Sequence, residues 1–110
     1  MKIDVVEEFI ALASLNSPSR KEARVAAYLI KRFRELGFPA TVDGSAELTG
    51  SDTGNLIVRV PGNAAGTTLL LCAHMDTVGP TEGMTPVFRD GVIYSNGETV
   101  LGPRTVSPLL

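Results

Sequence analysis

An unbroken apolar run that ends at the only histidine of the chain places the strongest constraint on the fold. The run is Leu69-Leu70-Leu71-Cys72-Ala73, and His74-Met75-Asp76 follows it directly. A stretch this apolar, with glycine at positions 66 and 79, is typical of a strand buried on both faces of a sheet. We therefore predict that this run forms a buried strand that ends at about His74. In open α/β sheets, ligands bind just outside the carboxyl ends of such strands, which is where His74 and Asp76 would lie.

The spacing of His74 and Asp76 gives a physical reason to pair them. On an extended backbone, side chains two residues apart point to the same side. Asp76 can then accept a hydrogen bond from one ring nitrogen of His74 and leave the other nitrogen free for a metal ion. On the spacing alone, a histidine beside a solvated aspartate is the more common explanation, because His-x-Asp is a short pattern.

Length and composition restrict the class of protein. The chain of 110 residues allows at most one domain with a modest core, and a hydrophobic content of 44% is typical of a globular chain. The net charge is −2 and no basic run is present, so nothing indicates a nucleic-acid partner. No apolar stretch is long enough to predict a membrane span, and the acidic N-terminal segment does not resemble a signal peptide. A single cysteine, Cys72, cannot form an internal disulfide and favours a reducing, cytoplasmic compartment.

Hydrophobic periodicity predicts two helices before the apolar run. Residues 3–15 carry apolar side chains at helical spacing, and Pro18 lies in the break that follows. Ser19 and Glu22 are spaced as a capping box, which predicts a second helix over residues 20–36. Gly37 is placed to end that helix.

The rest of the chain predicts short strands separated by turns and loops. A long polar segment over residues 43–54 is a loop by composition, and Asp90-Gly91 is a strong signal for a two-residue hairpin. The predicted strands cover residues 38–42, 55–60, 87–89 and 92–94, and the second of them is expected to neighbour the buried strand. The fold class predicted from this order is α/β, with two helices followed by a mixed sheet and a hairpin.

Five short motifs, in a fixed order along residues 3–102, carry a resemblance to a known family. They are Ser17-Pro18-Ser19 with Glu22, the segment 50–57, the segment 73–78 that contains His74 and Asp76, the hairpin 90–93, and the segment 97–102. With them the chain resembles the N-terminal part of the dinuclear zinc metallopeptidases that include peptidase T, carboxypeptidase G and succinyl-diaminopimelate desuccinylase. Within that family it is most similar to the peptidase T-like, or aminotripeptidase, branch.

The resemblance implies specific roles for two residues. His74 would ligate one of two zinc ions, and Asp76 would be the catalytic-site aspartate that orients His74. The family hydrolyses peptide bonds of short peptides with a zinc-bound hydroxide, and a glutamate serves as general base. The resemblance also implies an α/β catalytic domain on a mixed sheet and a smaller inserted domain that is used in homodimerisation.

One departure from the family pattern bears on activity. After Leu101-Gly102 the family places an aspartate that bridges both zinc ions, whereas this chain has Pro103-Arg104. We therefore expect residues 1–102 to be the N-terminal part of a catalytic domain and residues 103–110 to be a divergent end. The catalytic glutamate and the remaining metal ligands are absent, so the chain as written is expected to be inactive. Its other carboxylates of note are expected to be solvated loop or turn residues: Asp52, Glu82, Asp90 and Glu98.

Three functional hypotheses follow from these observations. The first is the N-terminal part of a peptidase T-like enzyme. The second is a non-catalytic α/β domain that retains the scaffold for binding or assembly. The third is a small enzyme that uses Cys72 and His74, which we disfavour because free cysteine is usually buried and no oxyanion donor can be identified.

Overall fold

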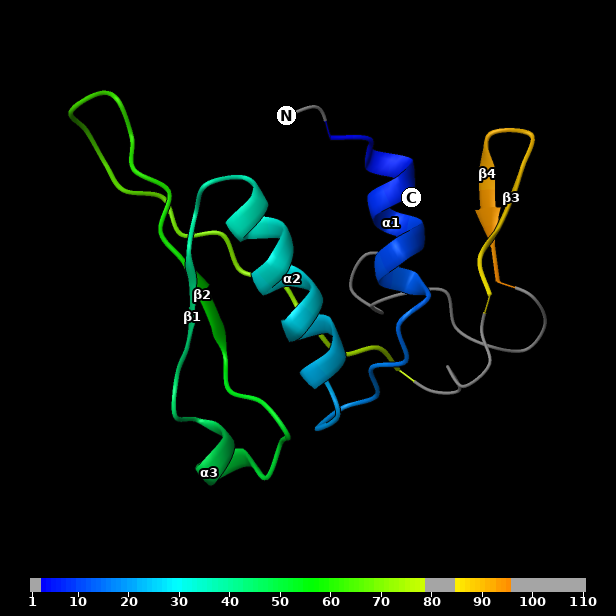
Figure 1. Cartoon of the computed structure of the whole chain (residues 1–110), viewed down its shortest axis with the longest axis horizontal. Coiled ribbons are helices and arrows are strands. Elements are labelled where there is room, and N and C mark those ends of the chain that lie inside the picture. The colour runs from blue at the N-terminus through cyan, green and yellow to red at the C-terminus, as the bar shows by residue number, and fades with distance from the viewer. Residues whose placement is uncertain (1–2, 79–84, 96–110) are drawn as a thin grey trace.

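The computed structural model describes residues 3–78 and 85–95. In Figure 1, helix α2 (Ala23–Glu35) lies between a small sheet on one side and helix α1 (Val5–Ala13) on the other. That sheet consists of β1 (Ala40–Val42) and β2 (Leu56–Val58), with the short helix α3 (Ala46–Thr49) between them in the chain. A hairpin of β3 (Val87–Arg89) and β4 (Val92–Tyr94) lies beyond α1. The predicted α/β class is confirmed, and so are the two leading helices and the hairpin. Within the described residues the strands form two separate antiparallel pairs and not one mixed sheet.

Both predicted helices form, and each is shorter than the sequence pattern suggested. Asp4 caps α1, because its carboxylate accepts hydrogen bonds from the backbone N–H groups of Val6 and Glu7 at 3.0 and 3.1 Å. Gly37 ends α2 as predicted. It adopts a left-handed φ of 90°, and the N–H of Phe38 returns to the carbonyl of Phe33 at 2.8 Å.

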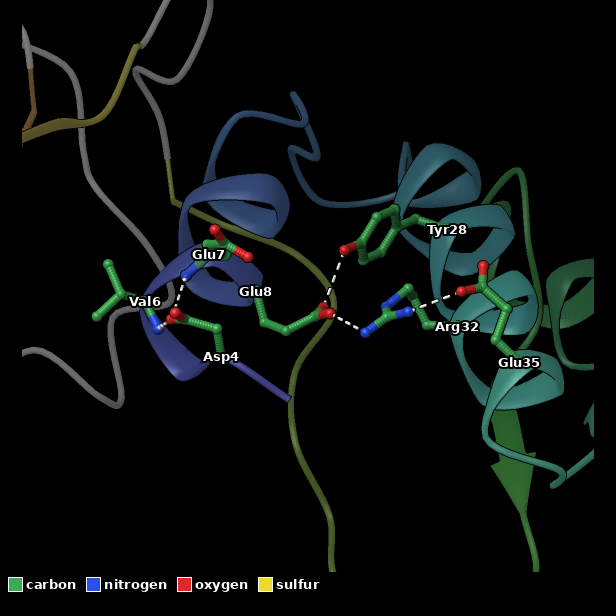
Figure 2. Close-up of polar contacts among 7 residues, drawn as sticks. All are labelled: Asp4, Val6, Glu7, Glu8, Tyr28, Arg32 and Glu35. Atoms are coloured by element: carbon green, nitrogen blue, oxygen red, sulfur yellow. Dashed lines mark hydrogen bonds and ion pairs between the residues drawn. The ribbon is translucent and has the colours of Figure 1, made fainter. Parts of the chain in front are cut away.

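Polar side chains join α1 to α2, as Figure 2 shows. The carboxylate of Glu8 on α1 forms an ion pair with Arg32 and accepts a hydrogen bond of 2.9 Å from the Tyr28 hydroxyl, both on α2. Arg32 also pairs with Glu35 one turn along α2, at 2.8 Å. The hydrogen bond from Arg32 is the main reason that the pKa of Glu8 is lowered. The Glu8 carboxylate therefore links α1 to α2 through two polar contacts.

The strands form two antiparallel pairs. Thr41 of β1 lies opposite Ile57 of β2, and Phe88 of β3 lies opposite Ile93 of β4. The Asp90-Gly91 hairpin is confirmed: both residues have positive φ, 51° and 76°, as a two-residue turn of this type requires. The segment 43–54, predicted to be loop throughout, contains the four-residue helix α3.

The prediction that the apolar run at residues 69–73 forms a buried strand is wrong. Leu69, Leu70 and Leu71 are 82%, 86% and 92% exposed, and Cys72 is exposed as well. No residue of the segment 69–78 lies in a strand, and its one bridge, between Pro18 and Thr77, is parallel. A strand buried on both faces needs paired neighbours and a covering layer on each side. Within the described residues β2 pairs with β1 instead, so the apolar run has no neighbouring strand.

The buried core of the described residues is small. Val25 and Ala26 of α2 are its apolar members, and Ser17 is buried with 1% of its surface exposed. No helix within residues 3–78 and 85–95 is long and apolar enough to cross a membrane. The predicted divergent end at 103–110 lies outside the described residues, and so does part of the predicted unit 1–102.

Candidate functional site

His74 and Asp76 come together as their spacing predicted. Nδ1 of His74 lies 3.1 Å from Oδ1 of Asp76. The His74 side chain is 62% exposed, while the Asp76 side chain is 30% exposed. In a neutral ring, an Nδ1–H that donates to the carboxylate leaves the Nε2 lone pair available to a ligand. The pair therefore presents one oriented imidazole nitrogen at an open surface.

The second carboxylate oxygen of Asp76 is held by Ser19. The Ser19 hydroxyl donates to Oδ2 of Asp76 at 2.5 Å, a length typical of a hydrogen bond to an ionised carboxylate. This hydrogen bond is the main reason that the pKa of Asp76 is lowered, and the contact with His74 lowers it further. Both effects favour the charged carboxylate, which is the form that accepts from Ser19 and His74 together.

Backbone contacts fix the two segments that carry Ser19 and Asp76. The N–H of Thr77 donates to the carbonyl of Ser17 at 2.8 Å, and the parallel bridge joins Pro18 to Thr77. The Thr77 hydroxyl also reaches the Ser17 carbonyl, at 3.4 Å. Because Ser17 is almost fully buried, this junction is the best-protected part of the site. It places residues that are 57 to 60 positions apart in the chain beside one another.

The described residues do not by themselves build a zinc site. A catalytic zinc ion needs about three protein ligands and one open position. Among residues 3–78 and 85–95, no group of three or more histidine, cysteine, aspartate or glutamate side chains could hold a metal ion. Within the described part of the chain, His74 offers one imidazole nitrogen, and Asp76 is the hydrogen-bond partner of the other nitrogen.

Two of the other carboxylates of note, Asp52 and Asp90, lie within the described residues. Asp52 is an exposed loop residue, as expected, and it also accepts a hydrogen bond of 3.0 Å from the backbone N–H of Ala23, so it caps the start of α2 from 29 residues away. Asp90 is in the hairpin turn, and Glu82 and Glu98 lie outside the described residues.

The capping box predicted from Ser19 and Glu22 is wrong. Ser19 donates to Asp76, and Glu22 accepts hydrogen bonds from the backbone of Arg20 at 2.7 Å and from the Ser51 hydroxyl at 2.6 Å. The roles of Ser19 and Asp52 were therefore missed. Their partners are 57 and 29 residues away, and no local spacing signals such contacts.

Two curated relatives match most of the chain. It is 35% identical over 98 residues to the uncharacterized protein YqjE of Bacillus subtilis, a match that covers 89% of this chain and 26% of that protein. It is 36% identical over 93 residues to a protein of Pyrococcus furiosus whose name proposes a LysW-lysine/LysW-ornithine hydrolase, covering 84% of this chain and 24% of that protein. The chain thus spans about a quarter of the length of the curated relatives it matches. No protein-family model matches it.

Two solved structures share the fold. Aminopeptidase PepT from Bacillus cereus is 39% identical with a TM-score of 0.81, covering 88% of this chain and 26% of the PepT chain. A tripeptidase from Staphylococcus aureus is 30% identical with a TM-score of 0.80, covering 87% of this chain and 26% of its own. The sequence matches and the structural matches cover nearly the same share of this chain.

Proposed function

Because this chain resembles the N-terminal part of the peptidase T-like family in sequence and in fold, we propose that it forms part of the catalytic domain of a metal-dependent peptidase. In this proposal His74 is a zinc ligand and Asp76 is the aspartate that orients it. The observation that carries the proposal is the contact between Nδ1 of His74 and Oδ1 of Asp76, on a ring that is exposed and whose Nε2 makes no hydrogen bond within residues 3–78 and 85–95.

The proposed substrates are short peptides. Two of the similar proteins are named as an aminopeptidase and a tripeptidase, and a third name proposes a hydrolase that acts on lysine or ornithine derivatives. In the completed site two zinc ions would supply a hydroxide near neutral pH and polarise the peptide carbonyl. The residues of this chain would orient one imidazole and keep Asp76 charged. We also propose, from the family resemblance, that the complete protein is a cytoplasmic homodimer.

The 110-residue chain is proposed to be inactive alone. One imidazole with one supporting carboxylate holds zinc weakly, because water must fill most of the coordination shell. The chain has Pro103-Arg104 where the family resemblance would place the bridging aspartate, and this supports the proposal.

The second candidate function is a non-catalytic binding or assembly domain. The exposed leucines at positions 69–71 favour it, because contiguous apolar surface is typical of interaction sites. Such a domain would need neither the His74–Asp76 contact nor a metal ion. The two functions therefore differ in what His74 contributes.

Zinc titration and an aminopeptidase assay on the purified chain test the proposal. We expect no stoichiometric zinc at micromolar concentration and no hydrolysis of a tripeptide. The His74→Ala variant should abolish the weak zinc binding that remains at millimolar concentration, whereas Glu47→Ala, on the short helix α3, should leave it unchanged. Equal weak binding by the wild-type chain and the His74→Ala variant would contradict the assignment of His74.

A further inference from the structure

We infer that Ser19 is a positioning residue that fixes the ring of His74 through the carboxylate of Asp76. Ser19 donates to one oxygen of Asp76 at 2.5 Å, and His74 contacts the other oxygen at 3.1 Å. The carboxylate is thereby held at both oxygens, by side chains from two distant parts of the sequence. The value of this arrangement for catalysis rests on the function proposed above, but the arrangement can be tested without any metal ion.

The physical argument starts from the freedom of an aspartate side chain. An exposed aspartate with one partner can rotate away from it, and the side chain of Asp76 is only partly covered, at 30% exposed. A short hydrogen bond to the second oxygen removes that rotation, because it fixes the plane of the carboxylate. Oδ1 then remains where Nδ1–H of His74 can reach it, and the ring is held in the tautomer that leaves Nε2 unprotonated.

The position of Ser19 is itself held from both sides. On one side, Ser17 accepts the N–H of Thr77, the residue next to Asp76, at 2.8 Å. On the other side, Arg20 adopts a left-handed φ of 73°, and its carbonyl accepts the N–H of Asp52 at 3.0 Å. A non-glycine residue in the left-handed region persists only where its surroundings fix it. The chain therefore turns immediately after Ser19, and the hydroxyl remains beside Asp76.

The test is nitrogen NMR of the imidazole in the full chain, at a pH where the ring is neutral. In the wild-type chain the ring nitrogen shifts should indicate mainly the Nδ1–H tautomer. Ser19→Ala should shift the balance toward the Nε2–H tautomer, and Ser19→Thr should restore the wild-type balance. The matched control is Ser14→Ala, which removes another exposed serine hydroxyl whose partner is the carbonyl of Ile10.

A second measurement separates positioning from a loss of local structure. The amide shift of Thr77 reports the backbone junction with Ser17, and it should stay near its wild-type value in Ser19→Ala. A wild-type tautomer balance in Ser19→Ala would overturn the inference, and so would an equal change in Ser14→Ala. A tautomer change that coincides with a lost Thr77 shift would also count against it. If the tautomer moves as expected but His74→Ala leaves zinc binding unchanged, the proposed function fails and the positioning role stands.

Discussion

At the scale of single residues, Asp43 organises the loop between β1 and β2. Its Oδ1 accepts hydrogen bonds from the N–H and hydroxyl of Ser45 and from the N–H of Asn55, and its Oδ2 accepts from the Asn55 amide. These contacts hold the pKa of Asp43 far below its usual range, with the Ser45 hydroxyl making the largest contribution. Gly54 passes so close to Asp43 that an added Cβ would collide with the Asp43 carbonyl oxygen and lie 2.7 Å from its Oδ1.

The close approach of Gly54 predicts a specific destabilisation. Gly54→Ala should lower the free energy of unfolding by roughly 1–3 kcal/mol, the range for a side chain forced into packed surroundings. Gly44→Ala is the matched control in the same loop, since a Cβ there meets nothing within 4 Å. Denaturant unfolding of the two variants beside the wild type checks the prediction. Equal stability of the two variants would show that the loop yields to the added methyl group.

The residue-scale features that sequence could predict were those whose cause is local. The Asp90-Gly91 turn follows from the need for two residues of positive φ, and the His74–Asp76 contact follows from a spacing of two on extended backbone. The role of Ser19 could not be predicted. The Ser19 hydroxyl could cap the nearby helix or donate to Asp76, which is 57 residues away. Only the fold brings Asp76 within hydrogen-bond distance.

At the scale of elements, the start of α2 is determined by a residue outside the helix. Asp52 accepts from the N–H of Ala23 at 3.0 Å, and Glu22, at the N-cap position, makes no side-chain capping bond. Asp52 is 29 residues away from the helix it caps, in the loop after α3. The helix start and that loop should therefore lose stability together.

Removal of the Asp52 carboxylate should weaken α2. Asp52→Ala is expected to lower the free energy of unfolding by about 0.5–2 kcal/mol, the usual range for the loss of a helix cap. Asp52→Asn retains an acceptor oxygen and should cost markedly less. Hydrogen exchange of the first-turn amides of α2 would localise the effect. Unchanged protection of the Ala23 amide in Asp52→Ala would contradict this assignment.

Prediction succeeded for elements that their own residues specify. The two helices follow from their hydrophobic periodicity, and the β3–β4 hairpin pairs strands that are adjacent in the chain. The end of α2 at Gly37 needs only the left-handed φ of that residue. The apolar run at 69–71 indicates a buried strand only if other strands flank it. No described strand flanks the run, so the apolar pattern at 69–71 did not produce the buried strand that it predicts.

At the scale of the whole molecule, exposed leucines and a small core should make the chain associate. The leucines at positions 69–71 are each more than 80% exposed, and their backbone lies in no strand. An extended apolar segment of this kind favours pairing with another copy of the chain. Light scattering should show that the mean mass rises with concentration. Leu70→Lys should reduce that rise, whereas Leu48→Lys, at a 91% exposed leucine on α3, should not. A monodisperse wild-type monomer that melts reversibly would contradict this prediction.

The central proposal, that His74 is a zinc ligand of a peptidase site, is tested most directly in a chimaera. Residues 3–102 of this chain would replace the corresponding quarter of the Bacillus cereus aminopeptidase PepT, with which it shares 39% identity, and PepT would supply the rest of the chimaera. The measurement is zinc content per folded chimaera. His74→Ala should lose zinc. Asp76→Ala should weaken zinc affinity by roughly 10–100-fold, the usual effect of removing the hydrogen-bond partner of a metal-ligating histidine. A His74→Ala chimaera that retains full zinc content and aminopeptidase activity would contradict the account.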